Sequence, residues 1–401
     1  MLIEGSNAAV IGGSIAGCAA AIALSRAGCS VTVYEAARGD LHDEGMGIPI
    51  PSSARDDLVA AGYLDPAMHT RRRDEVTWLT RDAESLAGWM VGRQKHSSTI
   101  VSWGLVWRHL RERLPAGMYH DGSPVTAIRP DPQGVTLEIA GGRDERFDIV
   151  LGADGHRSQV RRIVAPEAGL SQAEYGMWRG GFPAERLSGI ARSRFTQELV
   201  AVGFAGGHAL FYLSPDPQPG RLRQNWAIYG PVPAWAYQAD PAWAARDPLG
   251  EGAIEFLHGL VDDQFPPSWA EVVRRTRPSE ITLSPVYDVS VSACAAGRLL
   301  LIGDAGTLVR PHIGVGPGAV KALQDACVLE RACRENRTWE SGVAVYDAER
   351  STVGTALTEL GKYLGRMQVE AAPDWPAMTP ERFTGWTRAN VEGWRATYGH
   401  R

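Results

Sequence analysis

The chain has 401 residues, and its 41 basic and 46 acidic side chains leave a formal net charge of −5. This length is enough for two or three domains whose cores need neither disulfides nor metals. A mildly acidic chain without long runs of like charge is not typical of a nucleic-acid-binding protein. The five cysteines are scattered and form no C-x-x-C pair, which argues against a disulfide framework and a structural metal site.

Residues 8–27 form a small, apolar stretch at the place where a signal peptide or a membrane helix would stand. Glycines interrupt its centre, Glu4 precedes it in place of a basic cluster, and Arg26 lies at its end. These features do not fit a targeting segment or a membrane span. We therefore expect a cytoplasmic protein that does not contact a membrane.

The first predicted elements are a strand, a turn, a helix and a strand in close succession. The apolar pattern places them at residues 8–11, 12–17, 16–27 and 30–34. Further along, the pattern predicts helices at 52–61 and 105–114, strands at 76–80 and 100–103, and a hairpin from 135–139 to 147–151. The chain thus begins with a β-α-β unit.

The residue pattern of the sequence changes after about residue 175. Residues 175–288 hold strand-like runs rich in aromatic side chains, with two helices, and are predicted to form a separate substrate-side module. A buried-strand pattern returns at 298–302, and helices are predicted at about 318–334 and 341–367. The nucleotide-binding part is therefore predicted to be discontinuous, and no element is predicted after residue 371.

The strongest local motif is Gly12-Gly13-Ser14-Ile15-Ala16-Gly17, with Glu35 at the end of the next strand. Small residues let a pyrophosphate approach the positive N-terminus of the helix, and the acid accepts hydrogen bonds from ribose hydroxyls. Ser14 replaces the middle glycine of G-x-G-x-x-G, so a small-residue helix packed closely on a strand stays an alternative. A serine hydrolase is a weaker alternative, because Ala16 stands where the nucleophile elbow has glycine.

Two later motifs accompany this fingerprint: Asp154-Gly155 with Arg161, and Gly303-Asp304 with Pro311. In this order the three motifs resemble those of the single-component FAD-dependent aromatic hydroxylases of the p-hydroxybenzoate hydroxylase type. Three segments are similar to the 2,6-dihydroxypyridine 3-hydroxylase branch: Gly12-Gly13-Ser14, Trp178-Arg179-Gly180 and Arg310-Pro311-His312. The resemblance extends to about residue 367.

The resemblance implies an α/β fold, with a Rossmann-like FAD-binding domain of the GR2 type interrupted by a β-sheet substrate domain and a long C-terminal helix. The FAD-binding domain is expected to comprise residues 1–75, 98–172 and 289–370. The substrate domain is expected at 76–97 and 173–288, and a C-terminal tail at 371–401.

The resemblance also implies which residues contact FAD besides the fingerprint and Glu35. Asp304 would receive hydroxyls of the sugar-like part of FAD, and Asp154 would help to hold FAD and to meet the nicotinamide cofactor. Arg108 would contact FAD, Gly47 belongs to the loop that passes the flavin ring, and Arg38 would reach the adenosine ribose or the pyrophosphate. Turn stabilisation is the alternative for Asp154, and a solvated charge is the alternative for both arginines.

In this family NAD(P)H reduces FAD, and O2 then forms a flavin C4a-hydroperoxide that transfers oxygen to an electron-rich ring. Backbone N–H groups of Gly314, Val315 and Gly316 would stabilise the negative charge of the reduced flavin. His312 is the candidate that polarises a hydroxyl of the substrate. Its alternative is a loop histidine satisfied by the backbone.

Aromatic side chains on the strands of the predicted substrate module are further candidates. Phe211, Tyr212, Trp226 and Tyr229 lie on such strands, where successive side chains face opposite sides, so only some of them can face a substrate. Tyr212 and Tyr229 could donate a hydrogen bond to the substrate, as could Arg179.

We therefore expect an FAD-dependent monooxygenase that uses NAD(P)H and O2 to hydroxylate a small hydroxylated aromatic or N-heteroaromatic ring. It would bind no metal and no nucleic acid, and a homodimer is left open as its assembly. The alternative is a flavin-binding redox sensor or sequestering protein without oxygenase turnover, because Thr307 and Pro317 depart from the family's usual residues. A flavin halogenase fits poorly, since the Trp-x-Trp-x-Ile run is absent.

Overall fold

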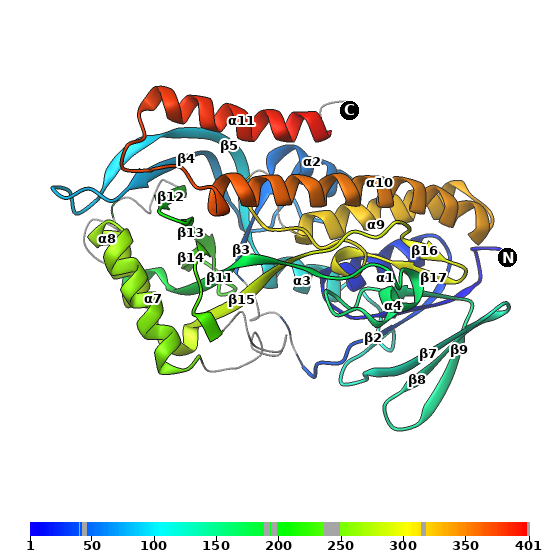
Figure 1. Cartoon of the computed structure of the whole chain (residues 1–401). Helices are drawn as coiled ribbons and strands as arrows, with labels where there is room; N and C mark the ends of the chain where they lie inside the picture. Colours follow the sequence, from blue (N-terminus) through cyan, green and yellow to red (C-terminus); the bar gives the residue numbers. More distant parts are fainter. Residues whose placement is uncertain are drawn as a thin grey trace.

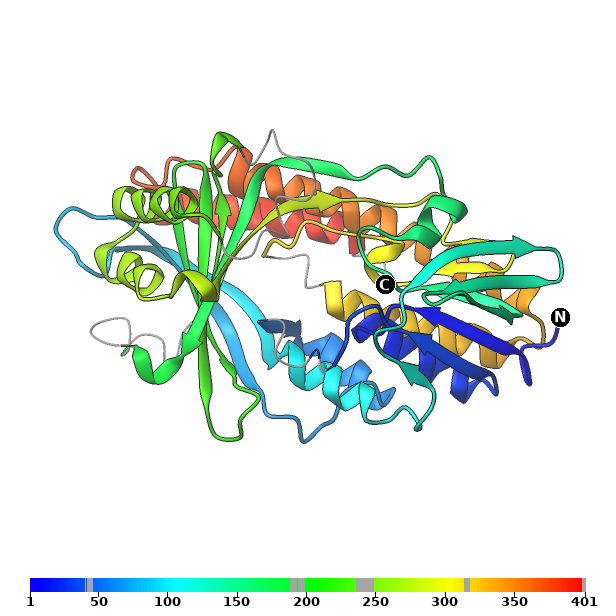
Figure 2. The ribbon, with the colours of Figure 1, turned by 90° about the horizontal axis from the view of Figure 1, so that it is seen from below.

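The computed structural model describes residues 1–39, 41, 46–187, 193, 199–235, 249–313 and 318–398. Two large β-sheets dominate it, one built around the N-terminal strands and one built mostly from the middle of the chain (Figure 1, Figure 2). Each sheet has its own buried apolar core. Among the helices of these residues, none combines the length and the apolar character needed to cross a membrane.

The first sheet has six strands in the order β16-β17-β10-β1-β2-β6. They are β1 (Asn7–Ile11), β2 (Ser30–Tyr34), β6 (Tyr119–His120), β10 (Ile149–Gly152), β16 (Ala295–Ala296) and β17 (Leu299–Leu301). All pairs are parallel except that of β16 with β17. Helix α1 (Ile15–Arg26) packs on this sheet and against α9 (Gly318–Glu335). The predicted Rossmann-like, discontinuous nucleotide-binding fold is confirmed.

A small antiparallel sheet follows in the chain and corrects one prediction. It consists of β7 (Val125–Asp131), β8 (Gly134–Ile139) and β9 (Arg143–Phe147). The predicted hairpin partner of residues 135–139 is wrong, because β8 pairs with β9, whereas β10 lies parallel to β1 in the first sheet. Gly141 and Gly142 both have positive φ and form a short turn after β8. This turn brings the chain back along β8 as β9, so β8 has its antiparallel partner before β10 begins.

The second sheet has eight strands in the order β15-β11-β14-β13-β12-β4-β5-β3. They are β3 (Gly47–Pro51), β4 (Arg71–Thr80), β5 (Trp89–Ser102), β11 (Ser171–Pro183), β12 (Leu199–Phe204), β13 (Gly207–Pro215), β14 (Leu222–Gly230) and β15 (Ile281–Asp288). This sheet includes β3 and the ends of β4 and β5, which the expected boundaries assign to the FAD-binding domain. The second sheet therefore crosses the expected boundaries between the two domains.

The two faces of the second sheet have different partners. Trp178, Phe211 and Trp226 lie on one face, in an apolar core with α7 (Glu251–Gln264) and α8 (Pro267–Arg274). Tyr212 and Tyr229 lie on the other face, because strand neighbours alternate between the faces. Of the four aromatic candidates, two therefore belong to the core and two are free to line a site.

The remaining helices connect and cover the sheets. They are α2 (Ser52–Ala60), α3 (Trp103–Arg111), α4 (Gln159–Val164), α10 (Trp339–Gly365), the π-helical turn η5 (Arg366–Glu370), α11 (Pro380–Tyr398), and three short 3₁₀ turns, η1 (Ala184–Arg186), η3 (Pro278–Glu280) and η4 (Gly303–Ala305). Helix α10 is the predicted long C-terminal helix, and its 27 residues span about 40 Å. It runs from the first sheet to the second (Figure 2), where Lys362 lies 3.6 Å from Asp288 of β15.

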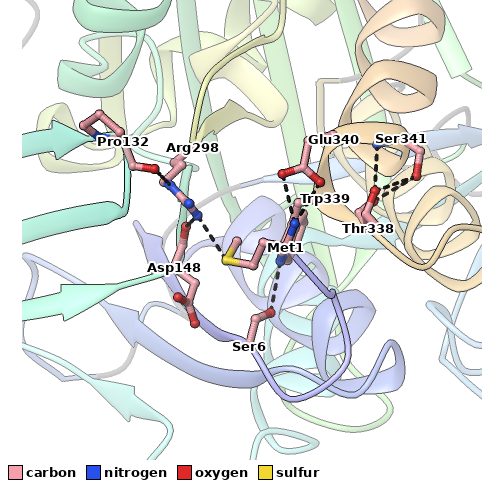
Figure 3. A network of polar contacts seen from close by, with 9 residues as sticks. All are labelled: Met1, Ser6, Pro132, Asp148, Arg298, Thr338, Trp339, Glu340 and Ser341. Atoms are coloured by element: carbon pink, nitrogen blue, oxygen red, sulfur yellow. Dashed lines mark hydrogen bonds and ion pairs between the residues drawn. The ribbon is translucent and has the colours of Figure 1, made fainter.

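Polar contacts around residue 1 attach the start of α10 to the first sheet (Figure 3). The amino group of Met1 donates to both carboxylate oxygens of Glu340 at 3.0 Å. The indole of Trp339 donates to the hydroxyl of Ser6, which immediately precedes β1, at 3.1 Å. These bonds fix one end of the helix that connects the two sheets.

Candidate functional site

The three sequence motifs meet at the carboxyl ends of β1, β10 and β17. A side chain at Gly12, whose φ is +101°, would collide with the carbonyl oxygen of Ala153 in the second motif. A Cβ at Gly303 in the third motif, where φ is +63°, would lie 2.8 Å from the Cβ of Ala16. Both positions therefore need glycine. This edge of a parallel sheet is where such folds bind dinucleotides.

The fingerprint turn is held by hydrogen bonds to Gly13. Trp107 of α3 donates to the carbonyl of Gly13 at 2.9 Å, and Glu35 accepts from the N–H of Gly13 at 2.6 Å and from that of Ala37 at 2.8 Å. Ser14 stands at the N-cap of α1, but its side chain makes no capping bond. The N-terminus of α1 is thus left uncapped by a side chain, which suits an anionic pyrophosphate group.

The other fingerprint residues have packing roles. Ile15 lies in the apolar core, and a side chain at Gly17 would collide with the carbonyl oxygen of Gly12. The close approach of α1 to β1 therefore depends on Gly17, the last glycine of the motif, as in dinucleotide-binding turns.

Asp304 has a partly buried carboxylate near Gly318, where an added Cβ would lie 3.0 Å from Oδ1. The pKa of Asp304 is raised overall. Burial is the main cause and the charge of Asp325 adds to the rise, whereas the positive charge of Lys321 opposes it. No hydrogen bond to this carboxylate is made by the side chains that the structure describes. A carboxylate in such a position can accept from hydroxyl donors, and the sugar-like part of FAD would supply them. Together with the uncapped helix, the residues present fit FAD.

A buried ion cluster supports Gly303 from behind. Asp325 of α9 accepts from the N–H of Gly303 at 2.9 Å and from Lys321 at 2.6 Å, and its Oδ1 lies 2.5 Å from Arg350 of α10. Burial would raise the pKa of Asp325, but Lys321 and Arg350 outweigh it and hold the pKa below the usual value. The cluster keeps the backbone of the third motif in its left-handed conformation.

Asp154 has a structural role in the described residues. It accepts from the hydroxyl of Ser158 at 2.5 Å and from the N–H of Gln159 at 2.7 Å, at the start of α4. Arg161 on the same helix donates to the carbonyl of Ala305 at 2.9 Å. The second motif therefore orders its own turn and holds the third motif next to it, which is the turn-stabilising alternative for Asp154.

Three further FAD candidates are placed less directly. Arg108 is half-buried on α3, one residue after Trp107, and the side chain of Arg38 covers Gly122. Gly47 begins β3, and an added Cβ there would lie 3.0 Å from Tyr212. The predicted flavin-facing turn Gly314-Val315-Gly316 lies outside the described residues.

A cavity of about 740 Å³ lies between the second sheet and the FAD-binding edge, and its wall includes all four residues predicted to act on the substrate. These are Arg179, Tyr212, Tyr229 and His312. Gly47 at the start of β3 and Gly318 at the start of α9 also line it, so the cavity extends from the second sheet to the first residue of α9. Its volume is in the range of sites for small molecules.

Strand register explains why residues far apart in sequence share this wall. Arg179 of β11 pairs with Ala227 of β14, and Ala227 pairs with Leu210 of β13. Tyr229 and Tyr212 follow at two-residue steps on the same face of their strands. One face of the sheet thereby forms a continuous floor for the cavity.

Arg179 is a cation without a protein partner in this wall. Its Nε is buried and makes no hydrogen bond to the described residues. Burial raises the pKa of Tyr229 to about 12, and the positive charge of Arg179 opposes this rise. The hydroxyl of Tyr212 is used within the protein, since it donates to the carbonyl of Gly47 at 2.8 Å. Arg179 is therefore the side chain most in need of an anionic ligand.

His312 is fully enclosed, and only one of its ring nitrogens is satisfied. Its Nε2 lies 2.6 Å from the hydroxyl of Tyr175, whereas its Nδ1 is buried with no hydrogen-bond partner among the described residues. Burial, His208 and Arg310 lower the pKa of His312 well below its ordinary value. The imidazole is therefore neutral near pH 7, and it can share a proton with a bound hydroxyl but not keep it.

Sequence reasoning missed the neighbours that define the state of His312. Tyr175 lies on β11, and His208 lies on β13 with its ring stacked on Tyr229 at 4.9 Å. His208 stands four residues before Tyr212, so the period of two along a strand would have placed both on one face. Tyr175 has no comparable signal, because its contact with His312 joins residues 137 positions apart.

We expect His208 to make the protein sensitive to acid. Burial lowers the pKa of His208 to about 4, although a bond to the carbonyl of Gln368 opposes the shift. Below pH 6.5 the unfolded chain takes up a proton that the folded protein excludes, so stability falls by about 3 kcal/mol between pH 6.5 and 4. Denaturant titrations across this range should show the fall, and His208→Asn should make it shallower. An equal slope in the variant would contradict the assignment.

Comparisons with known proteins identify the family of the chain. Residues 6–360 match the FAD binding domain family. The chain is 32% identical over 334 residues to 3-amino-4-hydroxybenzoate 2-monooxygenase PtmB3 of Streptomyces platensis, covering 80% of this chain and 78% of that one. It is 27% identical over 383 residues to 2,6-dihydroxypyridine 3-monooxygenase of Paenarthrobacter nicotinovorans, covering 90% and 91%.

Solved structures show the same fold. 2,6-dihydroxypyridine-3-hydroxylase from Arthrobacter nicotinovorans superposes with a TM-score of 0.80 at 24% identity, covering 93% of this chain and 96% of that one. Klebsiella pneumoniae HpxO, complexed with FAD and uric acid, has a TM-score of 0.75 at 20% identity and covers 98% and 95%. The curated relatives named above are monooxygenases, which favours the predicted enzyme over a redox sensor or sequestering protein. The chain therefore belongs to the FAD binding domain family and is an FAD-dependent monooxygenase of the aromatic hydroxylase type.

Proposed function

We propose that the cavity binds a small hydroxylated aromatic or N-heteroaromatic ring that carries an anionic oxygen, and that this ring is hydroxylated there. The observation that supports this proposal is the unpaired Arg179 in the same wall as Tyr229 and His312. FAD, when bound, would accept electrons from NAD(P)H and would activate O2. Relatives named for 3-amino-4-hydroxybenzoate, 2,6-dihydroxypyridine and 6-hydroxynicotinate act on rings of this class.

The side chains divide the work of holding such a ring. Arg179 pairs with its anionic oxygen, which is a carboxylate or an ionised hydroxyl. Nδ1 of His312 exchanges a hydrogen bond with a second oxygen, and this makes the ring more electron-rich. Apolar side chains such as Leu199 and Leu210 complete the wall and keep water away from the reacting carbon.

A substrate screen tests this function. Purified protein loaded with FAD is mixed with NADH or NADPH and O2, with one ring at a time: 2,6-dihydroxypyridine, 6-hydroxynicotinate, 3-amino-4-hydroxybenzoate, and phenol as a ring without an anionic group. We expect an anionic ring to accelerate oxidation of the reduced nicotinamide and to yield a product with one added oxygen. Acceleration by phenol alone, or no oxygenated product from any ring, would refute the proposal.

His312→Gln is expected to leave FAD binding intact and to reduce coupled hydroxylation at least tenfold, in line with the usual contribution of a positioned proton-exchanging group, roughly 10²–10⁴. More of the reduced nicotinamide should then end as hydrogen peroxide. Product and peroxide are measured per nicotinamide oxidised. Tyr175→Phe is the companion variant, because it removes only the hydroxyl at Nε2 and should change the pH profile more than the maximal rate. Unchanged coupling in His312→Gln would end the proposed role.

Four expectations stay predictions. The division into an FAD-binding domain (1–75, 98–172, 289–370), a substrate domain (76–97, 173–288) and a tail (371–401) is proposed here as a functional division. Location in the cytoplasm and assembly as a homodimer are proposed as well, and size-exclusion chromatography with light scattering measures the assembly. Individual contacts of FAD with Arg38, Gly47, Arg108, Asp154 and Asp304 are proposals of the same kind.

A further inference from the structure

The C-terminal segment, residues 371–398, packs on the cavity side of the second sheet. It lies beyond the family match, which ends at residue 360, and it carries the helix α11 beside α10 and over β5 (Figure 1). Trp375, Met378 and Phe383 are buried in one apolar cluster with Trp78 of β4 and Tyr212 of β13. The segment therefore covers the part of the sheet face next to the cavity.

The fit between this segment and the sheet is specific. The ring of Trp375 stacks on Trp78 with centroids 5.0 Å apart and an interplanar angle of 12°. A side chain at Gly203 of β12 would collide with Trp375, and one at Gly92 of β5 would collide with Phe383. Two strand positions thus lack a side chain where the rings of the C-terminal segment lie. Such interlocking indicates a permanent part of the fold.

Helix α11 is also bonded to the preceding helical segment. Trp386 donates to the carbonyl of Met367 at 3.4 Å, and Tyr363 donates to the carbonyl of Ala389 at 3.3 Å. These bonds attach α11 to the preceding helical segment at residues 386 and 389. The next position, Asn390, is therefore held in place relative to the sheet.

Asn390 belongs to the wall of the cavity and has an unsatisfied acceptor. Its side chain is 4% exposed, and its Nδ2 donates to the carbonyl of Trp386 at 3.0 Å. Its Oδ1 is buried with no hydrogen-bond partner among the described residues. An unpaired buried acceptor is unfavourable, and a ligand that offers an N–H or O–H group would relieve it.

We infer that α11 is a wall of the substrate cavity and that Asn390 is a specificity-determining residue, whose Oδ1 accepts a hydrogen bond from an N–H or O–H group on the bound ring. This inference rests on the proposed function, since the ring must occupy this cavity. Arg179 recognises an anionic oxygen, whereas Asn390 recognises a donor. The two residues together select rings that carry both groups and reject those in which the donor is missing or methylated.

The test uses the FAD-loaded protein and two pairs of rings. The first pair is 2,6-dihydroxypyridine and 2-hydroxy-6-methoxypyridine, and the second is 3-amino-4-hydroxybenzoate and 4-hydroxybenzoate, which lacks the amino donor. Dissociation constants are read from the change that each ring causes in the visible flavin spectrum, so no turnover is needed. Asn390→Leu is compared with the wild type, and Thr384→Ala, an exposed change on the same helix, is the control.

In at least one pair, we expect the wild type to prefer the ring with the donor by about tenfold or more. Asn390→Leu should remove that preference by weakening only the donor ring, and Thr384→Ala should keep it. If Asn390→Leu does not retain FAD, Asn390→Ala takes its place. Equal weakening of both rings, or an unchanged preference, would overturn the inference while leaving the proposed function standing. If the wild type binds none of the four rings, the proposed function fails and the inference with it.

Discussion

Asp325→Asn is expected to lower the free energy of unfolding by about 3–5 kcal/mol, because it removes one partner from a buried ion cluster. Lys321 and Arg350 would remain as two buried cations that have lost the carboxylate they pair with, so their desolvation is offset much less. The carbonyl oxygen of the new side-chain amide could still accept from the N–H of Gly303. The substitution therefore removes the charge and keeps this hydrogen bond. Urea titration of the FAD-free protein followed by circular dichroism measures the effect.

A surface ion pair provides the matched control. Asp262 pairs with Arg274, and both side chains are roughly half exposed. Asp262→Asn should therefore cost less than about 1 kcal/mol, as exposed pairs usually do. FAD retention gives a second measure, because of these two aspartates only Asp325 contacts the backbone next to Asp304. If the two variants lose the same stability, the buried cluster does not stabilise the third motif as we infer.

Arg179→Met is expected to raise KM for the anionic ring by about 10- to 100-fold, the usual range for a charge-assisted hydrogen bond. Nε of this guanidinium has no hydrogen-bond partner among the residues that the structure describes, so the effect should fall on binding more than on kcat. Arg179→Lys should recover part of the affinity, since it keeps the charge without the planar fork. Steady-state rates of nicotinamide oxidation over a range of ring concentrations give both constants.

Arg223→Met is the control for this experiment. Arg223 lies on the neighbouring strand β14, donates to the carbonyl of Gly181 at 2.9 Å and does not line the cavity. Its replacement should leave KM within about twofold of the wild type, because the side chain does not line the cavity in which the ring is proposed to bind. A KM for Arg179→Met no higher than that of Arg223→Met would rule out Arg179 as the anion-binding residue.

The parts of the fold that the sequence predicts well are those with local signals. The first β-α-β unit needs only a short apolar strand, a small-residue turn and a helix, and all of these lie within residues 8–34. The hairpin prediction failed because residues 147–151 have the same apolar pattern whether they pair with β8 or with β1. Which partner an apolar strand takes depends on the rest of the sheet.

The candidate site, like the fold, was predicted from the sequence only in part. Residue type and motif order single out Arg179, His312 and Asp304, but they do not reveal that Tyr175 contacts Nε2 of His312 or that His208 lowers its pKa. Those contacts join strands β11 and β13 to a loop more than 100 positions away. Proximity of this kind follows from strand register and sheet order, which one sequence does not display.

By itself, the sequence determined the nucleotide-binding class, the three-part FAD signature and the discontinuous order of the parts. It could do so because glycines, acids and buried strands act at short spacing and have few alternative uses. Only the tertiary structure decided which aromatic residues face the cavity, which groups surround His312, and that Asn390 closes the wall. These depend on one strand register, one sheet order and the docking of a tail, and each is set by packing between residues distant in the chain.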